Sequence, residues 1–596
     1  MARFRYFYPE ARLVKKRLIP LITGLAFFTA AAGQQPYVHI IHPGRPVIQT
    51  AQSRNYLSGN TCKGCRLTMN GTAVKVYPTG SFAVQVDLEP GDTLLQFTST
   101  SPGGTTASQK VTYHFRVPVP PAAVQDFRMA KVETLPEGNC WLMPGEEIRF
   151  RVTAQPGNKI TVNQTIPLYE LPASQTGGVP GVYQGTYRVR AQDPNLKKPF
   201  LVRMTGHGHE QTYSVSPAYR VLGPDEIVVG ETVGALPYLE FGLGTDRLGG
   251  AKISYLDTAV RLQVTGKFAG QYRVQLSKGR SAYIPVGNVL LLPKGTFSPR
   301  SLTGSWRVWG DDRYDYVSIG LAEKLPYTTF QQIDPSRIVM DIYGATSNSN
   351  WITQLQSARE IKNVWYRQIE DGVFRVTIAL RHHQHWGYEV YYTGNALTVR
   401  VKRQPANLSL SHLTIAVDPG HGGTNRGALG PANIYEKQIT LEIAKKLEAL
   451  LKQQGATVIM TRTTDASKDM IQRTSLLRMA DPDLLVSVHL NSAADPIHVS
   501  GTSTYYRYIG FRPLSVAILR HMLGLGLQEY GNVGRFNFSL NGPTEYPNAL
   551  VETLFLSNPE DEMKALDPGF QQQIAQAIVA GIRDFLKQAG DTPAQH

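Results

Sequence analysis

The chain has 596 residues, of which 42% are hydrophobic and 18% charged, and it carries a formal net charge of +15. This length is too great for one core and predicts roughly three to five domains, while the composition excludes an intrinsically disordered protein. No run of interleaved basic and aromatic residues indicates nucleic-acid binding, and we expect no nucleic acid as a partner.

Residues 1–33 have the pattern of an export signal. Lys15, Lys16 and Arg17 precede "LIPLITGLAFFTAAAG", an apolar run that ends in small residues. A transmembrane anchor is the alternative, but about 15 apolar residues are short for a span and no stop-transfer flank follows. We therefore predict cleavage near Ala32 or Gly33, no transmembrane anchor in the mature chain, and export to the periplasm or cell wall.

Removal of this segment leaves a basic protein. Residues 1–33 contain six basic residues and one acidic residue, a net +5, so the mature chain would keep +10 of the +15. A basic exported protein is attracted to anionic envelope polymers.

Residues 37–117 consist of short alternating segments such as "TAVKVYP", "SFAVQVDL" and "TLLQFTST". Strands at this spacing predict an antiparallel β-sandwich, and the stretch resembles the immunoglobulin-like modules of bacterial exported enzymes. "VPVPPAAV" (117–124) is typical of a linker. Residues 125–223, with "EEIRFRVTAQ" and "GTYRVRAQ", predict a second β-sandwich.

Two further β regions precede the last third of the chain. Residues 230–295, which include "AVRLQVTGKFAGQYRVQLSKGRSAYIP", resemble a small SH3-like barrel of the bacterial wall-associated kind. Residues 303–403, with "YDYVSIGL", "RIVMDIYG" and "ALTVRVKR", are similar to the β-rich accessory domain that precedes the catalytic domain in some cell-wall amidases.

Two motifs in these regions allow a metal interpretation. "TCKGC" (61–65) is compatible with a zinc half-site, a redox pair or a local disulfide, and the disulfide is favoured because no second cysteine pair and no helix start accompany it. "RHHQHW" (381–386) would place His383 and His385 on one face of a strand, with His382 on the other. Without an acidic or cysteine partner nearby in sequence, we expect a solvated strand face.

From Leu413 onward strands alternate with helices, which predicts an α/β domain with a central sheet flanked by helices. "LTIAVD", "ATVIMT", "DLLVSVHLN" and "PNALVET" are the expected strands. "EKQITLEIAKKLEALLKQQG" is an expected helix, because Ile439, Ile443, Leu447 and Leu451 recur every four residues and Gly455 follows. "DMIQRTSLLRMA", "RPLSVAILRHMLGLGL" and "PGFQQQIAQAIVAGIRDFLKQ" are the other expected helices.

Four polar residues lie where this fold would gather them. His421 follows the first strand, Glu436 opens the first helix, His489 closes the third strand and Glu552 ends "NALVE". Loops beyond the carboxyl ends of strands form the site in such sheets. Three of these residues have an ordinary explanation when taken alone. His421 is compatible with a surface histidine, Glu436 with a charge at a helix N-terminus, and His489 with a buried, hydrogen-bonded histidine. Glu552 is costly to bury without a role.

Together these residues indicate a metal site. Two histidines and one carboxylate form a common catalytic zinc set that leaves a position for water. Zinc lowers the pKa of that water toward about 7, and a carboxylate off the metal is needed to take and return the proton. His421, Glu436 and His489 are the candidate ligands of Zn²⁺, and Glu552 is the candidate general base and acid.

The same region carries a resemblance. "IAVDPGHGG", "YEK" (435–437), "SVHLN" (487–491), "GTSTYY" (501–506) and "VETLFLSNPED" (551–561) resemble, in order and spacing, the zinc-dependent N-acetylmuramoyl-L-alanine amidases of the amidase-3 type. The resemblance covers about 413–588 and also includes "GATVIMTRTTD", followed by Arg473. It implies zinc bound by His421, Glu436 and His489, and Glu552 as the catalytic carboxylate. The implied reaction hydrolyses the amide between N-acetylmuramic acid and L-alanine in peptidoglycan.

The sequence departs from the family pattern at two positions. Leu554 stands where the family usually has glycine, and we expect it to narrow the groove beside Glu552. Asp481 replaces a common asparagine, and we expect altered packing near the site. Some relatives carry a long insertion whose helix covers the zinc. Here about 45 residues separate Tyr506 from Glu552, so we expect no such covering helix.

Two classes of function compete, and a zinc hydrolase of the same scaffold that acts on a different amide is a third option. The first is a peptidoglycan hydrolase whose N-terminal β modules hold it to peptidoglycan, with envelope or division proteins as further candidate partners. The alternative is a non-catalytic envelope protein that binds peptidoglycan through a degenerate amidase domain. Such a protein would typically have lost a ligand or the carboxylate, whereas this chain keeps all four residues.

Overall fold

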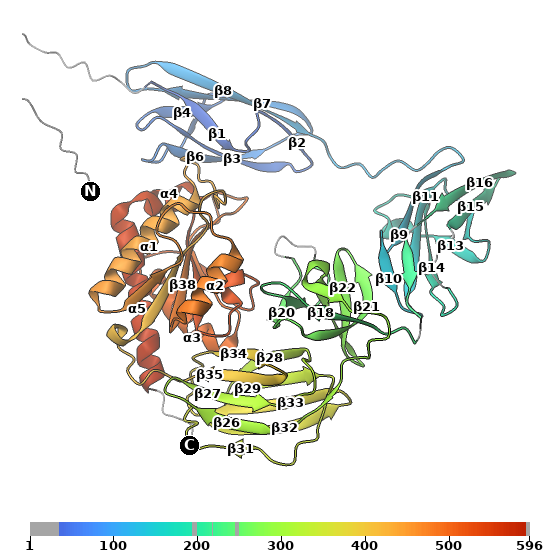
Figure 1. Cartoon of the computed structure of the whole chain (residues 1–596). Coiled ribbons are helices and arrows are strands. Elements are labelled where there is room, and N and C mark those ends of the chain that lie inside the picture. The colour runs from blue at the N-terminus through green and yellow to red at the C-terminus, as the bar shows by residue number, and fades with distance from the viewer. Residues whose placement is uncertain (1–34, 194–198, 217, 224, 245–248, 592–596) are drawn as a thin grey trace, which may run out of the picture.

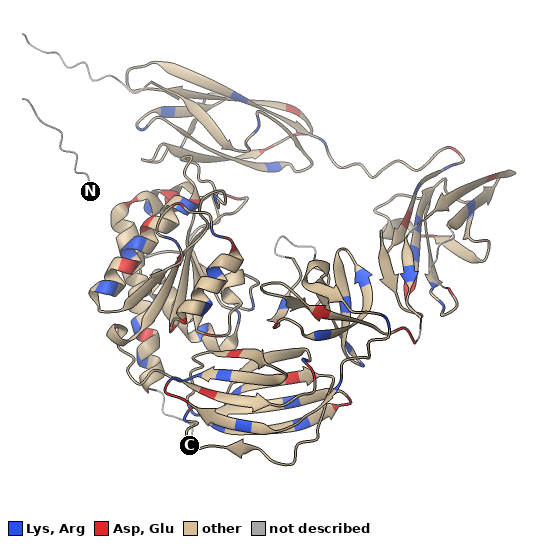
Figure 2. Cartoon of the chain, in the orientation of Figure 1, with Lys and Arg blue, Asp and Glu red and all other residues tan. Residues whose placement is uncertain are grey.

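The computed structural model describes residues 35–193, 199–216, 218–223, 225–244 and 249–591. It shows a multidomain chain in which β modules precede a C-terminal domain of sheet and helices (Figure 1). The predicted export signal, residues 1–33, lies outside the described residues. None of the helices in the described part of the chain has an apolar stretch long enough to cross a bilayer. Lysine and arginine are spread over all the modules (Figure 2).

The first β module comprises residues 35–117 and has two sheets that pack face to face, with strand orders β1-β3-β6 and β2-β8-β7-β4-β5. Leu57 and Phe82 from the first sheet meet Leu67, Phe97 and Val111 from the second in one core. The strands are β1 (Val38–His42), β2 (Val47–Thr50), β3 (Arg54–Thr61), β4 (Arg66–Met69), β5 (Thr72–Val74), β6 (Ser81–Asp87), β7 (Gly91–Thr100) and β8 (Thr106–Phe115).

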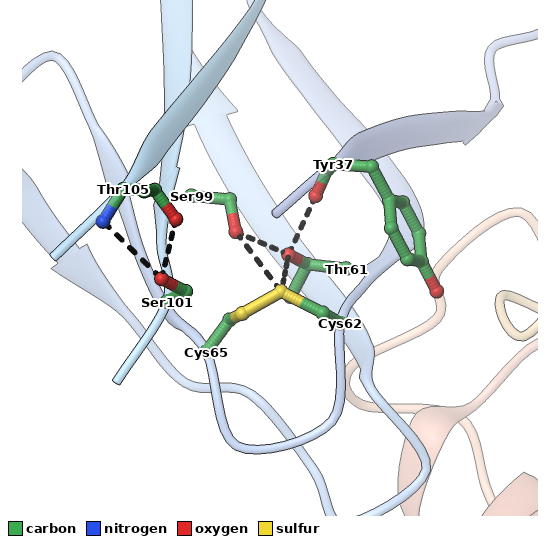
Figure 3. The surroundings of a disulfide bond; sticks show 7 residues. All are labelled: Tyr37, Thr61, Cys62, Cys65, Ser99, Ser101 and Thr105. Atoms are coloured by element: carbon green, nitrogen blue, oxygen red, sulfur yellow. Dashed lines mark hydrogen bonds between the residues drawn. A yellow bond between two sulfur atoms is a disulfide. The ribbon is translucent and has the colours of Figure 1, made fainter. Parts of the chain in front are cut away.

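A disulfide joins Cys62 and Cys65 just after β3, as predicted, with the Cα atoms 5.4 Å apart (Figure 3). Beside it, the hydroxyl of Thr61 donates to the carbonyl of Tyr37 over 2.6 Å and lies 2.6 Å from the hydroxyl of Ser99. The end of β3 is thereby tied to both sheets of the module. Cys140, the remaining cysteine, is buried and unpaired.

The next two predicted modules share strands. One seven-stranded sheet has the order β16-β15-β12-β13-β14-β11-β9. In the following nine-stranded sheet, β10 from the region 125–223 pairs with β21, where Trp141 lies opposite Lys267. The elements are β9 (Met129–Leu135), β10 (Cys140–Leu142), β11 (Glu147–Ala154), β12 (Lys159–Val162), β13 (Ile166–Glu170), η1 (Ala173–Gln175), β14 (Val182–Arg188), β15 (Phe200–Gly206), β16 (His209–Val215), β17 (Tyr219–Val221), β18 (Val228–Thr232), β19 (Tyr238–Glu240), β20 (Lys252–Tyr255), β21 (Arg261–Phe268), β22 (Gln271–Ser277), β23 (Arg280–Pro285), η2 (Val286–Asn288) and β24 (Val289–Leu291).

The accessory region is built from two sheets, β31-β26-β27-β35-β34 and β28-β29-β33-β32, and a short pair, β25-β30. Its core is continuous with that of the preceding region. The strands are β25 (Ser301–Leu302), β26 (Trp306–Gly310), β27 (Tyr314–Ile319), β28 (Tyr327–Ile333), β29 (Ser336–Tyr343), β30 (Ala345–Thr346), β31 (Thr353–Gln354), β32 (Ile361–Glu370), β33 (Val373–Leu380), β34 (Tyr388–Thr393) and β35 (Ala396–Lys402).

The expectation of a solvated histidine strand at 381–386 is wrong. These residues form the connection between β33 and β34, not a strand. His382 Nδ1 lies 2.5 Å from a carboxylate oxygen of Glu360, which is remote in sequence. His385 is only 1% exposed because it packs against Gly510 of the C-terminal domain. An interdomain contact, which leaves no periodic signal in sequence, therefore buries His385, while His383 stays exposed.

The C-terminal domain has the predicted α/β architecture. Its six-stranded sheet has the order β37-β36-β38-β41-β39-β40, and all neighbours are parallel except β39 and β41. The elements are η3 (Leu410–His412), β36 (Thr414–Pro419), α1 (Glu436–Gln453), β37 (Thr457–Met460), α2 (Met470–Ala480), β38 (Leu484–Asn491), β39 (Thr502–Tyr505), η4 (Ile509–Phe511), α3 (Arg512–Leu523), β40 (Glu529–Val533), η5 (Ser539–Asn541), β41 (Asn548–Phe555), α4 (Pro559–Leu566) and α5 (Pro568–Asp591).

Helices cover both faces of this sheet (Figure 1). On one face α1, α3 and α5 enclose the main core, to which the predicted stripe of Ile439, Ile443, Leu447 and Leu451 contributes. On the other face Leu477 of α2 packs with Leu485 and Tyr546. α3, the helix between Tyr506 and Glu552, buries Leu514 and Ile518 in the main core. α3 is thus part of the core of this domain.

Candidate metal centre

The three predicted ligands come together at one edge of the sheet. His421 lies on the loop after β36, Glu436 is the first residue of α1, and His489 lies near the end of β38. One ligand atom from each lies within 4.8 Å of the others. β36 and β38 are adjacent and parallel, so their carboxyl ends meet at the same edge, as the α/β pattern predicts.

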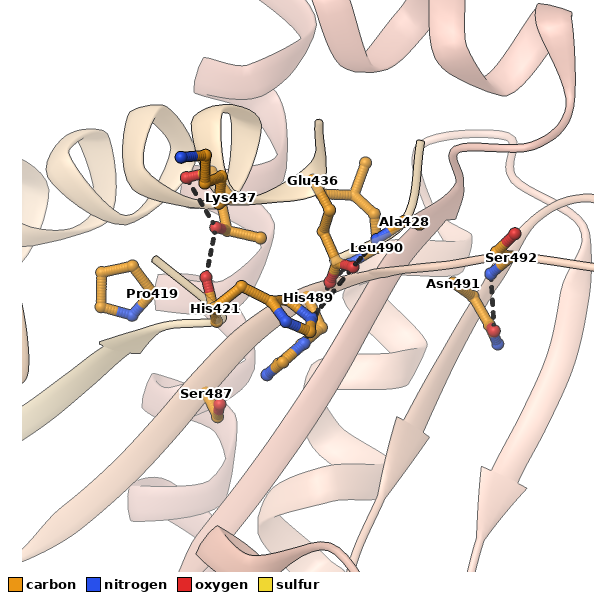
Figure 4. A network of polar contacts seen from close by, with 12 residues as sticks. Pro419, His421, Ala428, Glu436, Lys437, Ser487, His489, Leu490, Asn491 and Ser492 are labelled. Atoms are coloured by element: carbon orange, nitrogen blue, oxygen red, sulfur yellow. Dashed lines mark hydrogen bonds and ion pairs between the residues drawn. The ribbon is translucent and has the colours of Figure 1, made fainter. Parts of the chain in front are cut away.

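The Glu436 carboxylate contacts both imidazoles (Figure 4). Its Oε2 is 3.0 Å from Nε2 of His421, and its Oε1 is 3.0 Å from Nδ1 of His489. The backbone N–H groups of Ala428 and Leu490 donate to the same oxygens, each over 2.9 Å. Both oxygens are thus directed toward the histidines by the fold itself.

The charges in this cluster favour an anionic carboxylate. Burial raises the pKa of Glu436, but the hydrogen bonds and charges of His421 and His489 outweigh burial and leave that pKa well below its usual range. Burial lowers the pKa of His421, and the hydrogen bond and charge of Glu436 together reverse this, so that pKa is raised. A divalent cation bound here would neutralise the anionic Glu436 carboxylate, as the protonated imidazoles do in its absence.

Two buried arginines hold the backbone that presents His421. Arg462 donates to the carbonyl oxygens of Pro419, over 3.0 Å, and of Gly420, over 2.8 Å. Arg473 donates to the carbonyl oxygens of Pro419 and His421. His421 itself has a φ of 62°, in the left-handed region. Such a conformation persists where the surroundings impose it, and it is common at functional sites.

Arg473 is in turn fixed by a buried aspartate. Asp418 pairs with Arg473 and accepts hydrogen bonds from Ser487, over 2.6 Å, and Thr461, over 2.5 Å. The other ring nitrogen of His421, Nδ1, lies 2.8 Å from the side-chain oxygen of Asn425. Contacts of this kind orient metal-binding histidines.

Glycines at 420 and 427 leave the space that the cluster occupies, which explains the glycine-rich loop around His421. A Cβ atom on Gly420 would lie 2.4 Å from Cε1 of His489. A Cβ atom on Gly427 would lie 2.5 Å from Oε2 of Glu436, and Gly427 has a φ of 70°. Any larger residue would clash with the ligand set.

Glu552 lies next to this cluster on β41, in register with His489 on the parallel strand β38. It is 6% exposed. The fourth predicted residue therefore belongs to the same edge of the sheet.

The expectation that Leu554 narrows the groove is wrong. The pairing of β38 with β41 is irregular beyond His489 and Glu552. Leu554 consequently faces the main core, where it is fully buried with Val551 and Leu556. The family's glycine position is filled here by a core side chain and not by a wall of the site.

Sequence reasoning missed most of the residues that support the ligands. No sequence pattern predicted a supporting role for Asp418, Arg462 or Asn425. Arg473 was identified only as part of the family resemblance. One signal was present, because Asp418 is a charged residue inside an apolar strand and needs a buried partner. Its partners Thr461, Arg473 and Ser487 lie 43, 55 and 69 residues further along the chain, and no local pattern connects them.

Comparisons with known proteins match the C-terminal domain and the accessory region. The family model of N-acetylmuramoyl-L-alanine amidases matches residues 415–584, and that of the AMIN domain matches residues 305–401. The germination-specific N-acetylmuramoyl-L-alanine amidase of Bacillus subtilis is 31% identical over 206 residues, which are 32% of this chain and 86% of that protein. The probable cell wall amidase LytH of Staphylococcus epidermidis is 32% identical over 30% of this chain and 63% of its own length.

Solved structures match the same part of the chain. The N-acetylmuramoyl-L-alanine amidase from Clostridium difficile 630 is 32% identical, with 29% of this chain and 97% of that chain covered and a TM-score of 0.28. The family model matches the C-terminal domain, and the match to the Bacillus subtilis relative covers 86% of that protein at 31% identity. The chain therefore belongs to the N-acetylmuramoyl-L-alanine amidases.

Proposed function

We propose that the chain is a zinc-dependent peptidoglycan hydrolase that cleaves the amide between N-acetylmuramic acid and the L-alanine of the stem peptide. His421, Glu436 and His489 would hold the zinc ion, and Glu552 would act as general base and acid. The observation that carries the proposal is the Glu436 carboxylate, which points one oxygen at each imidazole at 3.0 Å. Two neutral imidazoles and one carboxylate are a donor set that catalytic zinc sites use.

A bound zinc ion would lower the pKa of a water molecule and polarise the scissile carbonyl. Glu552 would take the proton of the attacking water and deliver it to the nitrogen of the departing L-alanine. The protein would bring this carboxylate to the reacting atoms through the pairing of β41 with β38. Arg462 and Arg473 would keep His421 oriented, because they donate to backbone carbonyl oxygens of its loop. Asp418 would in turn fix Arg473.

The N-terminal regions would attach the enzyme to the envelope. We propose an immunoglobulin-like module at 37–117, a second β-sandwich at 125–223, an SH3-like barrel at 230–295, an accessory domain at 303–403 and the catalytic domain at 413–588. The matched AMIN model supports an exported, envelope-bound protein. Location in the periplasm or cell wall, after cleavage of residues 1–33, is part of the same proposal.

Access to the site would not require displacement of a covering helix, since α3 belongs to the core. Mass spectrometry of peptidoglycan fragments tests the proposal. Digestion should release stem peptides with a free L-alanine amino group and leave intact muramic acid, and a chelator should abolish the release until zinc is restored. Cleavage within the glycan or between amino acids of the peptide would contradict the proposed bond.

A further inference from the structure

The first β module contacts the turn that leads into Glu436. Residues 429–434 form a turn whose base is closed by a bridge between Leu429 and Tyr435. At this base, the N–H of Glu436 donates to the carbonyl of Ala428, and the N–H of Ala428 donates to the Glu436 side chain, each over 2.9 Å. The position of this 429–434 turn therefore bears directly on the Glu436 carboxylate.

The tip of the 429–434 turn is held by Glu562 of α4. This side chain is 0% exposed, and its Oε1 accepts a hydrogen bond of 2.8 Å from the N–H of Ala432. A Cβ atom on Gly430 would lie 2.2 Å from the same oxygen, so the turn is seated tightly against the carboxylate. A carboxyl group enclosed in this way needs a partner for its second oxygen.

That partner comes from the first β module, nearly five hundred residues away in the sequence. The hydroxyl of Ser81 donates to Oε2 of Glu562 over 2.6 Å. The side-chain N–H of Asn60 donates to the carbonyl of Pro431 over 2.7 Å, and both of these contacts are buried. His42 adds a contact of 3.1 Å to the carbonyl of Leu429.

These contacts come from one side of the module. Asn60 on β3 and Ser81 on β6 are directly opposite each other in the antiparallel register. The three-stranded sheet that carries them faces α4 (Figure 1). The disulfide of Cys62 and Cys65 and the hydrogen bonds of Thr61 fix the end of β3 next to Asn60 (Figure 3). The surface that meets the turn is thus rigid.

We propose that the β module of residues 35–117 is a positioning element of the active site: Asn60 and Ser81, through Pro431 and Glu562, hold the 429–434 turn and so fix Glu436 among the metal ligands. The inference rests on the proposed role of Glu436 as a zinc ligand. It assigns the module a task in catalysis besides attachment to the envelope. Asn60, Ser81 and Glu562 act through the turn and are positioning residues.

The test uses the full-length mature chain with the double variant Asn60→Ala/Ser81→Ala. Loss of two buried hydrogen bonds corresponds to roughly a 30- to 100-fold effect on the seating of the turn, and only part of this effect reaches Glu436. We expect kcat on peptidoglycan to fall about tenfold with little change in KM, and zinc to be lost to a chelator about tenfold faster. The matched control is Thr98→Ala/Ser108→Ala, which removes a hydrogen-bonded pair on the other sheet of the module and should behave as wild type.

A second pair of variants separates positioning from simple stability. Glu562→Gln keeps an acceptor for Ala432 and a partner for Ser81, and it should retain most of the turnover and the slow zinc release. Glu562→Ala should show both defects at a temperature where circular dichroism shows the protein folded.

Each outcome has a defined meaning. Variants that match wild type in kcat and in zinc release would overturn the inference, and variants with raised kcat would do so too, because the module would then restrain the site. If the wild-type chain itself needs no metal, the proposed function has failed. If wild type is zinc-dependent and only the variants are unaffected, this inference alone has failed.

Discussion

His489 and Glu552 lie opposite each other on the adjacent parallel strands β38 and β41. Residues paired in this way have Cα atoms about 4.8 Å apart and direct their side chains to the same face of the sheet. A histidine that would bind the metal and a carboxylate that would move the proton therefore occupy neighbouring positions on rigid strands. The register of β38 and β41 thereby sets the distance between His489 and Glu552.

This relationship predicts the effect of Glu552→Gln. The amide keeps the size of the side chain but cannot accept a proton, so turnover should fall by about 10²–10⁴, the usual contribution of a general acid–base group. Zinc content, measured by elemental analysis, should stay at the wild-type level. Undiminished activity would remove Glu552 from the mechanism, and loss of zinc would make it a ligand.

His421→Ala should behave differently, because zinc and activity should be lost together. Asn425→Ala, which removes the 2.8 Å contact to His421 Nδ1, should weaken zinc binding by about 10–100-fold and leave the ligand set complete. Chelator titrations followed by activity measurements check both variants. Normal zinc content in His421→Ala would count against its role as a ligand.

The sequence was sufficient to predict the α/β domain and the convergence of His421, Glu436 and His489, because both leave local patterns. Ile439, Ile443 and Leu447 mark one helix face, and His421 and His489 follow apolar strands. The contacts between modules leave no such pattern. Ser81 and Glu562 are ordinary polar residues in sequence, and their relation arises only when two separately folded units meet. The burial of His385 was missed for the same reason.

Leu554→Ala tests whether the departure from the family's glycine is structural. Leu554 is 0% exposed in the main core, so the variant should lose about 2–5 kcal/mol of the free energy of unfolding of the catalytic domain. Zinc content and the bond cleaved should not change. Calorimetry measures the stability, and mass spectrometry of the peptidoglycan fragments identifies the bond cleaved. A change in the fragments released at unchanged stability would show that Leu554 contributes to the substrate groove.

Lys402 joins the accessory domain to the catalytic domain. Its ammonium group, 4% exposed, donates to the carbonyl of Pro482 over 2.6 Å and to a side-chain oxygen of Asp481 over 3.0 Å. Asp481, the residue that replaces the family's asparagine, thus packs against the accessory domain.

Lys402→Met removes these bonds and leaves buried acceptors without a donor. The contact between the two domains should weaken by about 1–3 kcal/mol, which limited proteolysis of the segment 403–412 would detect as faster cleavage. Lys362→Met, an exposed position on the accessory domain, is the control. Equal cleavage rates for the two variants would show that Lys402 does not hold the domains together.

His385 should make the stability of the same interface depend on pH. Burial lowers the pKa of His385 to about 4, compared with about 6.5 in an unfolded chain. One reason is visible in its contacts: Nε2 lies 2.8 Å from the carbonyl of Gln332, while Nδ1 is buried without a hydrogen-bond partner, so a second proton would have no acceptor.

Between pH 6.5 and 4 the unfolded chain binds this proton and the folded chain does not. The stabilisation from neutral His385 is therefore complete above pH 6.5 and is lost as the pH falls to 4, by at most about 3 kcal/mol. His385→Gln should show a shallower decline in melting temperature over this range by calorimetry of the full-length chain. His383→Gln, at a neighbouring exposed position, should keep the wild-type decline. If both variants decline like wild type, another group accounts for the acid sensitivity, and the buried imidazole does not titrate on unfolding.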